Sequence, residues 1–361
     1  METGVVPTRY WHRLDDGRVQ CDLCPRACRL REGQRGLCFV RARREERVVL
    51  TTYGRSSGFC VDPIEKKPLN HFLPGSSVLS FGTAGCNLTC RFCQNWEISK
   101  SREIDTLADA ASPEQIADTA LRLGCRSVAF TYNDPVPFME YAIDCADAAR
   151  ARGLKAVAVT AGYVCPEPRV EMFRHMDAAN VDLKGFSESF YRSVCGGQLG
   201  AVLDTLVHLR HHTGVWLEVT TLLIPGHNDS DAELDRMTRW MIESLGDDVP
   251  LHLTAFHPDF RMLDVPATPA ATLSRARRIA MANGLRHVYT GNVRDIEGGT
   301  TRCSGCGGEV MVRDGYDLLA YRLDQRGRCI ACGRSCPGVF DGSPGDWGGR
   351  RRPVRMATRA H

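Results

Sequence analysis

The sequence predicts an α/β protein in which six parallel strands, each followed by a helical segment, form a barrel or partial barrel. Short apolar runs rich in β-branched residues alternate with helical segments over residues 76–295. This alternation is typical of parallel strands joined by crossover helices. Polar groups or cysteines follow each run at once, and barrel enzymes place their active sites at the C-terminal ends of strands. The predicted strands span residues 78–81, 127–131, 156–160, 180–183, 215–223 and 251–256, and a last apolar run covers 287–290.

Helix-start and helix-stop signals support the segments between these strands. Ser112 is expected to cap a helix that has Pro113 at its first position, and Gln115 completes a capping box. Two further amphipathic segments end at a glycine, which is a common helix terminator. They are residues 138–152 before Gly153 and residues 231–245 before Gly246.

Small cysteine-rich modules are expected on both sides of the strand–helix region. The segment between the first module and the first strand contains three prolines, which forbid a continuous helix or central strand, so we expect a connector there. The final residues are rich in Gly, Pro and Arg, and we expect a disordered tail. The expected division is a cysteine-rich module at 1–50, a connector at 51–75, the partial barrel at 76–295, a zinc-ribbon-like module at 296–340 and a disordered tail at 341–361.

Composition and cysteine usage indicate the compartment. The 361 residues are 43% hydrophobic and 25% charged, as in an ordinary globular protein, and a formal net charge of +3 does not point to nucleic acid or membrane as a partner. No signal peptide opens the chain, and no apolar run approaches the roughly 18 residues needed to span a bilayer. The seventeen cysteines are mostly grouped, which indicates metal ligands rather than disulfides. We therefore expect a cytoplasmic protein.

Three cysteines, Cys86, Cys90 and Cys93, fall within eight residues after the first predicted strand. Thiolates this close together can all reach one small inorganic core, and iron–sulfur clusters are held at such spacings. Three protein ligands on a four-iron cubane leave one iron open to a small molecule. The alternative is half of a zinc site, or thiols buried as small hydrophobic groups, although zinc usually takes two cysteine pairs on separate turns. The spacing favours a 4Fe-4S cluster.

Each terminal module carries four cysteines with metal-ligand spacing. Four thiols in the first module fit zinc or a second iron–sulfur cluster, and free cysteines in a loop are the alternative. The second module has two CxxC knuckles separated by a strand-like stretch, which is zinc-ribbon spacing, and zinc would supply the core that so small a module lacks. The expected ligands are Cys21, Cys24, Cys28 and Cys38 in the first module and Cys303, Cys306, Cys329 and Cys332 in the second.

Several stretches together resemble the radical S-adenosylmethionine (SAM) enzymes of the AmmeMemoRadiSam system, within the broader group of pyruvate formate-lyase activating enzymes. The central cysteine motif, with an aromatic residue before its last cysteine, is similar to the superfamily signature, and stretches 62–72 and 94–98 are similar to the particular family. The resemblance covers nearly the whole chain to about residue 340. It also includes residues 21–38, 85–99, 130–135, 181–184, 222–228, 256–258, 289–292 and the terminal knuckles.

The resemblance implies a fold, cofactors and site residues. The fold would be a partial radical SAM barrel of six strand–helix units, and the cofactors a 4Fe-4S cluster on Cys86, Cys90 and Cys93 together with SAM bound at its open iron. Asn133 and Asp134 would lie in the segment that holds the SAM amino group. The other implied contacts are Phe92 near the adenine, Thr160, Asp182 and Lys184 around the methionine carboxylate and ribose, Ile224 packed on the adenine, and His257 pointing into the site.

The leading hypothesis is an enzyme that cleaves SAM reductively and uses a 5′-deoxyadenosyl radical to remove hydrogen from an unidentified substrate, either a protein or a small molecule. It would need a one-electron donor such as ferredoxin or flavodoxin, and the resemblance adds AmmeMemoRadiSam proteins as partners. Two alternatives stay open: an activase that makes a glycyl radical on a partner enzyme, and a non-catalytic metal-binding module that recruits other macromolecules. Cys195, which no base accompanies, is interpreted as a structural thiol.

Overall fold

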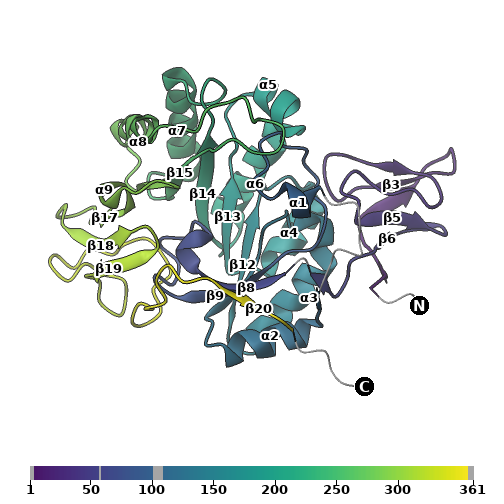
Figure 1. Cartoon of the computed structure of the whole chain (residues 1–361), viewed down its shortest axis with the longest axis horizontal. Coiled ribbons are helices and arrows are strands. Elements are labelled where there is room, and N and C mark those ends of the chain that lie inside the picture. Colours follow the sequence, from purple (N-terminus) through teal and green to yellow (C-terminus); the bar gives the residue numbers. More distant parts are fainter. Residues whose placement is uncertain (1–3, 57, 101–108, 357–361) are drawn as a thin grey trace.

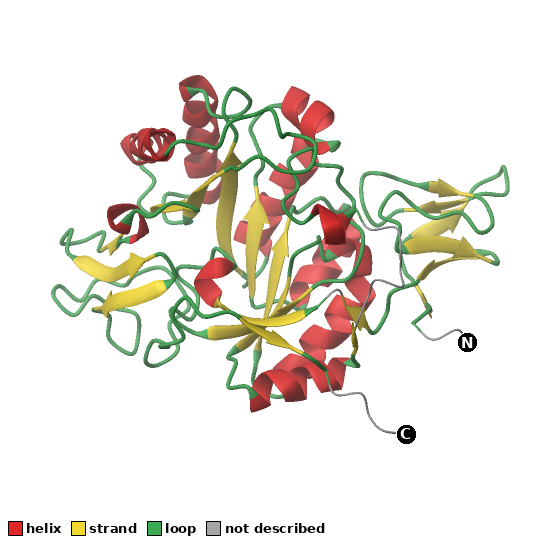
Figure 2. Cartoon of the chain, viewed as in Figure 1, coloured by secondary structure: helices red, strands yellow, loops and turns green. Residues whose placement is uncertain are grey.

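In the computed structural model of the chain, residues 4–56, 58–100 and 109–356 are described. A central sheet lies between two smaller β modules, which sit at opposite ends of the long axis of the molecule (Figure 1). One module is built from the N-terminal residues and the other from residues that follow the central sheet. The helices gather around the central sheet (Figure 2).

Seven parallel strands form most of the nine-stranded central sheet. They are β9 (Ser77–Phe81), β11 (Ser127–Phe130), β12 (Lys155–Thr160), β13 (Ala178–Asp182), β14 (Trp216–Leu223), β15 (Leu251–Ala255) and β16 (Val288–Gly291). Each pairs in parallel with the next in chain order. Their residues are almost all buried, because helices and neighbouring segments cover both faces, and this burial explains their apolar sequences.

The predicted α/β class with a large parallel sheet is confirmed. All six predicted strands are present, with ends that differ by no more than two residues, and the last apolar run forms a seventh parallel strand, β16. Within the described residues the sheet is open, with β16 at one edge and an antiparallel strand at the other. The C-terminal ends of the seven parallel strands therefore share one edge of the sheet.

Helices connect the strands and cover the sheet. They are α1 (Trp96–Ser99), α2 (Pro113–Arg122), α3 (Met139–Arg150), α4 (Pro166–Arg174), α5 (Glu188–Phe190), α6 (Leu199–His212), α7 (Asp231–Leu245), α8 (Ala270–Asn283) and α9 (Ile296–Gly299), with 3-10 turns η1 (Ile64–Lys66) and η3 (Val136–Phe138) and a π-helical turn η4 (Tyr191–Cys195). Helix α3 packs on β11 and β12, α6 on β14, and α8 on β15 and β16. The predicted capping box of Ser112 and Gln115 is present at the start of α2.

Two segments outside the predicted barrel also belong to the central sheet. The connector expected at 51–75 contains β8 (Phe59–Pro63), which pairs antiparallel with β9. The tail expected to be disordered contains β20 (Arg352–Val354), which pairs with β8 and forms the edge of the sheet. Proline is tolerated at the end of a strand and in an edge strand, where no ladder N–H is needed. The expected connector thus contains a strand, and the expectation of disorder is wrong for β20, while residues 357–361 of the tail lie outside the described residues.

The two small modules are antiparallel. The N-terminal module contains β1 (Val6–Pro7), β2 (Trp11–Arg13), β3 (Val19–Cys21), β4 (Arg29–Leu30), β5 (Arg41–Arg44) and β6 (Arg47–Leu50), in sheets of order β1-β6-β5 and β2-β3-β4. Next to it, β7 (Arg55–Ser56) pairs with β10 (Asp109–Ala110). The C-terminal module contains β17 (Thr301–Arg302), β18 (Glu309–Asp314) and β19 (Asp317–Tyr321). Such short sheets bury little apolar surface, so they depend on packing against the central body or on bound metal.

A buried carboxylate holds the segment after η1 on the sheet. Glu218 of β14 accepts hydrogen bonds from the backbone N–H groups of Asn70 and His71, at 3.0 and 2.8 Å, and is also bonded by ring nitrogens from β14 and β15. His71 Nδ1 lies 2.6 Å from the backbone oxygen of Pro337, so the same segment holds the C-terminal module. Burial alone would raise the pKa of Glu218, but the hydrogen bonds and charges of the neighbouring rings lower it to about 2.

We expect Glu218→Gln to lower the free energy of unfolding by about 3 kcal/mol, because it deprives several buried donors of an ionised acceptor. Urea unfolding at pH 7 measures this loss, with the exposed Glu243→Gln on α7 as the control. Folding lowers the pKa of Glu218 from 4.5 to about 2, so its contribution is complete above pH 4.5 and is lost as pH falls toward 2. A variant as stable as the control at pH 7, or a stability difference that grows below pH 4.5, would contradict this.

Candidate functional site

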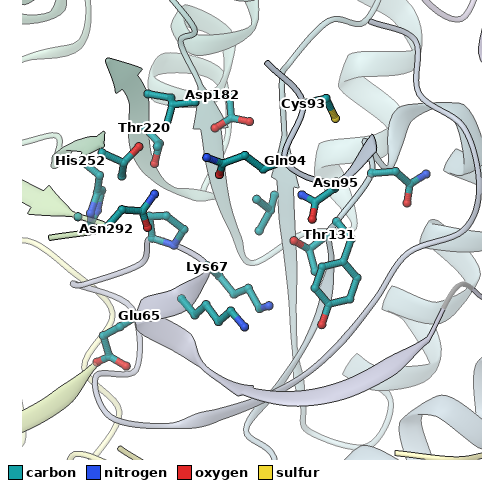
Figure 3. Close-up of a pocket in the computed structure, with 18 of the residues that line it drawn as sticks. Glu65, Lys67, Cys93, Gln94, Asn95, Thr131, Asp182, Thr220, His252 and Asn292 are labelled. Atoms are coloured by element: carbon teal, nitrogen blue, oxygen red, sulfur yellow. The ribbon is translucent and has the colours of Figure 1, made fainter. Parts of the chain in front are cut away.

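A cavity of about 1090 Å³ lies at the C-terminal ends of the parallel strands. Its walls bring together the loop after β9, the strand ends from β11 to β16, the segment after β8, and part of the C-terminal module. Polar side chains from elements far apart in the sequence therefore meet in one space (Figure 3). Those labelled in Figure 3 are Glu65, Lys67, Cys93, Gln94, Asn95, Thr131, Asp182, Thr220, His252 and Asn292.

The loop after β9 carries Cys86, Cys90 and Cys93, and all three residues line the cavity. Gly85 begins this loop with a left-handed backbone, φ 79°, and lies against the N-terminal module. A Cβ on Gly85 would lie 1.9 Å from the backbone oxygen of Cys38. Only glycine allows both this backbone conformation and this close approach. The N-terminal module thus forms a direct support for the cysteine loop.

The second half of the cysteine loop packs against η4. The backbone N–H of Thr89 donates to the backbone oxygen of Cys195 at 2.9 Å. A hydrogen bond from the Cys195 thiol lowers the pKa of Cys90, with help from the charge of Lys184, although burial opposes the shift. Burial raises the pKa of Cys86, so the surroundings favour the thiolate at Cys90 and oppose it at Cys86. Cys195, interpreted from the sequence as a structural thiol, contacts one of the predicted ligands.

Asp182 and Lys184, at the end of β13, lie beside the cysteine loop. Lys184 Nζ is 2.9 Å from a carboxylate oxygen of Asp182 and 5.9 Å from the centre of the Phe92 ring. Burial alone would lower the pKa of Lys184, but Asp182 and the nearby thiols raise it, so the ammonium form persists. These three predicted residues line the cavity together and present a cation, a carboxylate and an aromatic ring.

Asn133, Asp134 and Thr160 also line the cavity, but groups of the chain already bind their polar atoms. Nδ2 of Asn133 donates to the backbone oxygens of Ala84 and Gly85, at 3.3 and 2.7 Å, at the start of the cysteine loop. Asp134 accepts hydrogen bonds from the Thr160 hydroxyl at 3.0 Å and from two backbone N–H groups, and burial raises its pKa. In the structure these residues fix the loop and the neighbouring strand ends.

Two residues expected to contact SAM do not line the cavity. Ile224 is buried directly after β14, where its N–H donates to the side chain of Asn228 at 2.7 Å and the chain turns back on itself. His257 is exposed, because a hydrogen bond from the preceding backbone N–H to Thr268 directs the chain away from the sheet after β15. A contact of these two residues with SAM stays a prediction, and His252 of β15 lines the cavity.

The cavity residues that the sequence did not predict as site residues include Gln94, Thr220 and His252. Nε2 of Gln94 and Oγ1 of Thr220 are buried and have no hydrogen-bond partner in the described part of the chain. His252 Nε2 lies 2.7 Å from Glu218. Buried polar groups without partners are costly unless a bound molecule satisfies them. A polar residue inside an apolar strand, as at Thr220 and His252, is the sequence signal that could have identified them.

The C-terminal module brings its four predicted cysteine ligands together. Their Sγ atoms all lie within 4.8 Å of one another. A tetrahedral zinc ion with Zn–S bonds of about 2.3 Å needs sulfur atoms about 3.8 Å apart. The group therefore has the geometry of a site for one metal ion. Two of the separations are 3.5 Å for Cys303–Cys332 and 3.8 Å for Cys306–Cys329.

The four N-terminal cysteines, Cys21, Cys24, Cys28 and Cys38, line one small cavity of about 20 Å³. Unlike the C-terminal four, their ligand atoms do not all approach within 4.8 Å, a spacing that the described residues show in the C-terminal group alone. Burial raises the pKa of Cys38 to about 11, and the fully buried cation Arg41 opposes the shift. These four thiols therefore do not have the single-ion geometry of the C-terminal group.

Comparisons with known proteins agree with this geometry. Residues 81–238 match the family model described as the radical SAM superfamily. The chain is 38% identical over 325 residues to an uncharacterized protein, MJ0808, of Methanocaldococcus jannaschii, and the match covers 90% of this chain and 96% of that protein.

Two solved structures are similar at low identity. One is a radical SAM methyltransferase from Sphaerobacter thermophilus, with 15% identity and a TM-score of 0.48, covering 81% of this chain and 78% of that chain. The other is a domain of the pyruvate-formate lyase-activating enzyme from Bacteroides vulgatus, with 17% identity and a TM-score of 0.41, covering 46% of this chain and 99% of that chain.

The parallel sheet, with three thiols on the loop after its first parallel strand, defines an α/β protein that has a cofactor-sized cavity at its strand ends. With the family match and the relative of similar length, the chain belongs to the radical SAM superfamily. This membership supports an enzyme. None of the helices in the described residues has the length and apolar character needed to cross a membrane.

We expect the purified protein to hold one zinc ion in the C-terminal module and Cys306→Ser to lose it, because three thiolates and a hydroxyl bind zinc more weakly than four thiolates. Elemental analysis by mass spectrometry gives the zinc content. Cys336→Ser is the matched control, since its thiol lies 3.8 Å from His71 Nδ1 and outside the group of four. Zinc retained in Cys306→Ser, or lost in Cys336→Ser, would contradict the assignment.

Proposed function

We propose that this chain is a radical SAM enzyme that cleaves SAM reductively at a 4Fe-4S cluster and abstracts hydrogen from a substrate that is not yet identified. One observation carries the proposal: three thiols on a single fixed loop line a large cavity at the C-terminal ends of parallel strands. When bound, the cluster and SAM would supply the 5′-deoxyadenosyl radical. The chain's own part is to hold both groups, position the substrate and exclude water.

The donor set of the loop fits an iron–sulfur cluster with three protein ligands. Cys86, Cys90 and Cys93 would hold it, since all three line the cavity from one loop. Gln94 follows the last ligand, and its unpartnered Nε2 faces the same cavity. A buried donor in this position suits an acceptor on a bound molecule.

SAM would lie along the wall formed by Phe92, Asp182 and Lys184. The persistent ammonium of Lys184 suits a carboxylate, Asp182 suits hydroxyl or ammonium groups, and the Phe92 ring suits a purine face. The hydroxyl of Thr160, held by Asp134, lies on the same side of the strand ends. A cavity of about 1090 Å³ exceeds the roughly 300–1,000 Å³ of typical ligand pockets, which leaves room for a substrate beside SAM.

We further propose that the N-terminal cysteines hold a second iron–sulfur cluster rather than zinc. Their sulfur atoms line one cavity but do not reach the close spacing of a single-ion site. The buried Arg41 would offset part of the negative charge that four thiolates bring into this interior.

The wider context follows from the same chemistry. We assign the chain to the AmmeMemoRadiSam system. The two stretches that are similar to that family, 62–72 and 94–98, both contribute to the cavity wall. We also assign the parallel sheet to a partial barrel of six strand–helix units. Reduction requires a one-electron donor such as ferredoxin or flavodoxin. Thiolate ligands need a reducing compartment, so we place the protein in the cytoplasm. The substrate is a protein or a small molecule.

After anaerobic reconstitution, wild-type protein with SAM and a reductant should form 5′-deoxyadenosine, and Cys90→Ala should form none. Cys90→Ala should also retain roughly half of the iron, because a four-iron cluster remains in the N-terminal module. The matched control is Cys125→Ala, a buried cysteine that does not line the cavity and should keep both iron and turnover. Chromatography of the nucleosides and iron analysis provide the measurements.

Formation of 5′-deoxyadenosine by Cys90→Ala would contradict the proposed set of cluster ligands. SAM that stays intact in the fully reconstituted wild-type protein would favour the non-catalytic metal-binding alternative. Complete loss of iron in Cys90→Ala, with the fold preserved, would contradict a second cluster on the N-terminal cysteines.

A further inference from the structure

A second group of charged side chains lies at the cavity away from the cysteine loop, around Asp62 of β8 and the two lysines that follow this strand. The carboxylate of Asp62 is completely buried there and lies 2.7 Å from Lys67 Nζ and 3.2 Å from Lys66 Nζ. The hydroxyl of Tyr132 donates to the same carboxylate at 3.0 Å, and Arg351 Nε lies 3.8 Å from it. Three basic side chains and a phenol therefore surround one carboxylate.

Lys67 is the buried cation of this group. Its side chain is 2% exposed, whereas those of Lys66 and Arg351 are 30% and 63% exposed. Burial lowers the pKa of Lys67 to about 8, and the charge of Lys66 acts in the same direction, although Asp62 opposes the shift. A desolvated lysine beside another cation is available as an unprotonated amine, which is a nucleophile.

The distribution of lysine in the chain is also unusual. Only five of the 46 lysine and arginine residues are lysines, so arginine supplies almost all of the positive charge. Four of the five line the cavity. Arginine cannot lose its proton in a protein, so a position that needs a free amine has to be lysine. The four are Lys66, Lys67, Lys100, which donates to the backbone oxygen of Leu88, and Lys184, which is paired with Asp182.

Tyr132 is held beside Lys67 in a strained conformation. Its backbone is left-handed, φ 72°, which is unfavourable for a residue of this size. Lys67 Nζ lies 5.1 Å from the centre of the Tyr132 ring, and the hydroxyl bonds to Asp62. Strain retained at a cavity wall is associated with function. Here it places a group that can donate and accept a proton next to the amine.

We propose that Lys67 is a catalytic residue that binds a carbonyl substrate, an aldehyde or ketone, as a Schiff base in this cavity. Nζ attacks the carbonyl carbon, and a carbon–nitrogen bond forms. The two protons of the amine leave with the carbonyl oxygen as one molecule of water, relayed by Asp62 and Tyr132, and no electron is gained or lost. This inference rests on the proposed function, because the imine would hold the substrate for hydrogen abstraction. In Figure 3 Lys67 extends into the cavity from the side away from Cys93.

Reductive trapping tests the proposal on the intact holoenzyme. The protein is incubated anaerobically with acetaldehyde or glyoxylate and sodium cyanoborohydride, which reduces imines to stable amines, and peptide mapping measures the adduct at each of the five lysines. Lys155 on β12 is the internal control, because it too is paired with an aspartate, Asp177 at 3.3 Å, but its side chain is 42% exposed.

At pH 8 Lys67 should be labelled at least about tenfold faster than Lys155, because its pKa of about 8 leaves roughly half of its amine unprotonated there. The labelling rate of Lys67 should rise with pH up to about 8 and then level. Tyr132→Phe, which keeps the ring but removes the hydroxyl, should slow labelling of Lys67 several-fold and leave Lys155 unchanged. Lys67→Arg should abolish the adduct at this position and leave that at Lys155.

Labelling of Lys67 that is no faster than that of Lys155, or labelling of Lys66 in its place, would overturn the inference. Trapping requires neither SAM nor a reduced cluster, so its result is independent of the proposed function. An adduct on Lys67 without formation of 5′-deoxyadenosine would support the inference and count against the proposed function. Formation of 5′-deoxyadenosine without an adduct on Lys67 would support the proposed function and contradict the Schiff base.

Discussion

The site depends on the loop after β9, which carries three thiols and is fixed by contacts on several sides; we call it the clamped loop. Hydrogen bonds reach this loop from several sides: the N–H of Gly85 donates to the backbone oxygen of Ile98 at 3.1 Å, and the side chain of Asn87 donates to the backbone oxygen of Tyr163 at 2.7 Å. Close packing against the N-terminal module and η4 removes the remaining freedom. Ligands fixed before the metal arrives lose little conformational entropy on binding it, and a fixed cluster position sets where the reactive carbon of SAM can lie.

The C-terminal module lines the cavity, and the N-terminal module supports the loop that does. The N-terminal module supports the cysteine loop through the contact between Gly85 and Cys38. The C-terminal module contributes Arg313 and Tyr316 to the cavity wall, and Arg313 donates to the backbone oxygen of Asn70 at 2.6 Å. Metal bound in either module would therefore stabilise a wall of the cavity, which gives a physical reason for placing metal ligands at both ends of the chain.

The sequence predicts the strands and the C-terminal four-cysteine group well because each depends on local pattern. Apolar runs and the capping box at Ser112 are local features, and the C-terminal knuckles are fixed by spacing. Tertiary context decides the rest. A proline-rich segment became β8 and a Gly/Pro/Arg-rich tail contributed β20, because each found a pairing partner at the edge of the sheet. His257 and Ile224 do not line the cavity, because hydrogen bonds after the strands turn the chain away. Gln94, Thr220 and Lys67 come from segments far apart in the sequence, and only the folded chain brings them to one cavity.

The central claim is that the clamped loop binds a 4Fe-4S cluster through three cysteines and leaves one iron for SAM. Mössbauer spectroscopy of the reconstituted, iron-57-enriched protein, with and without SAM, tests it most directly. The account predicts that SAM changes the isomer shift and quadrupole splitting of one iron among the four of this cluster, and that Cys90→Ala lacks the change. Iron spectra that are identical with and without SAM would contradict it.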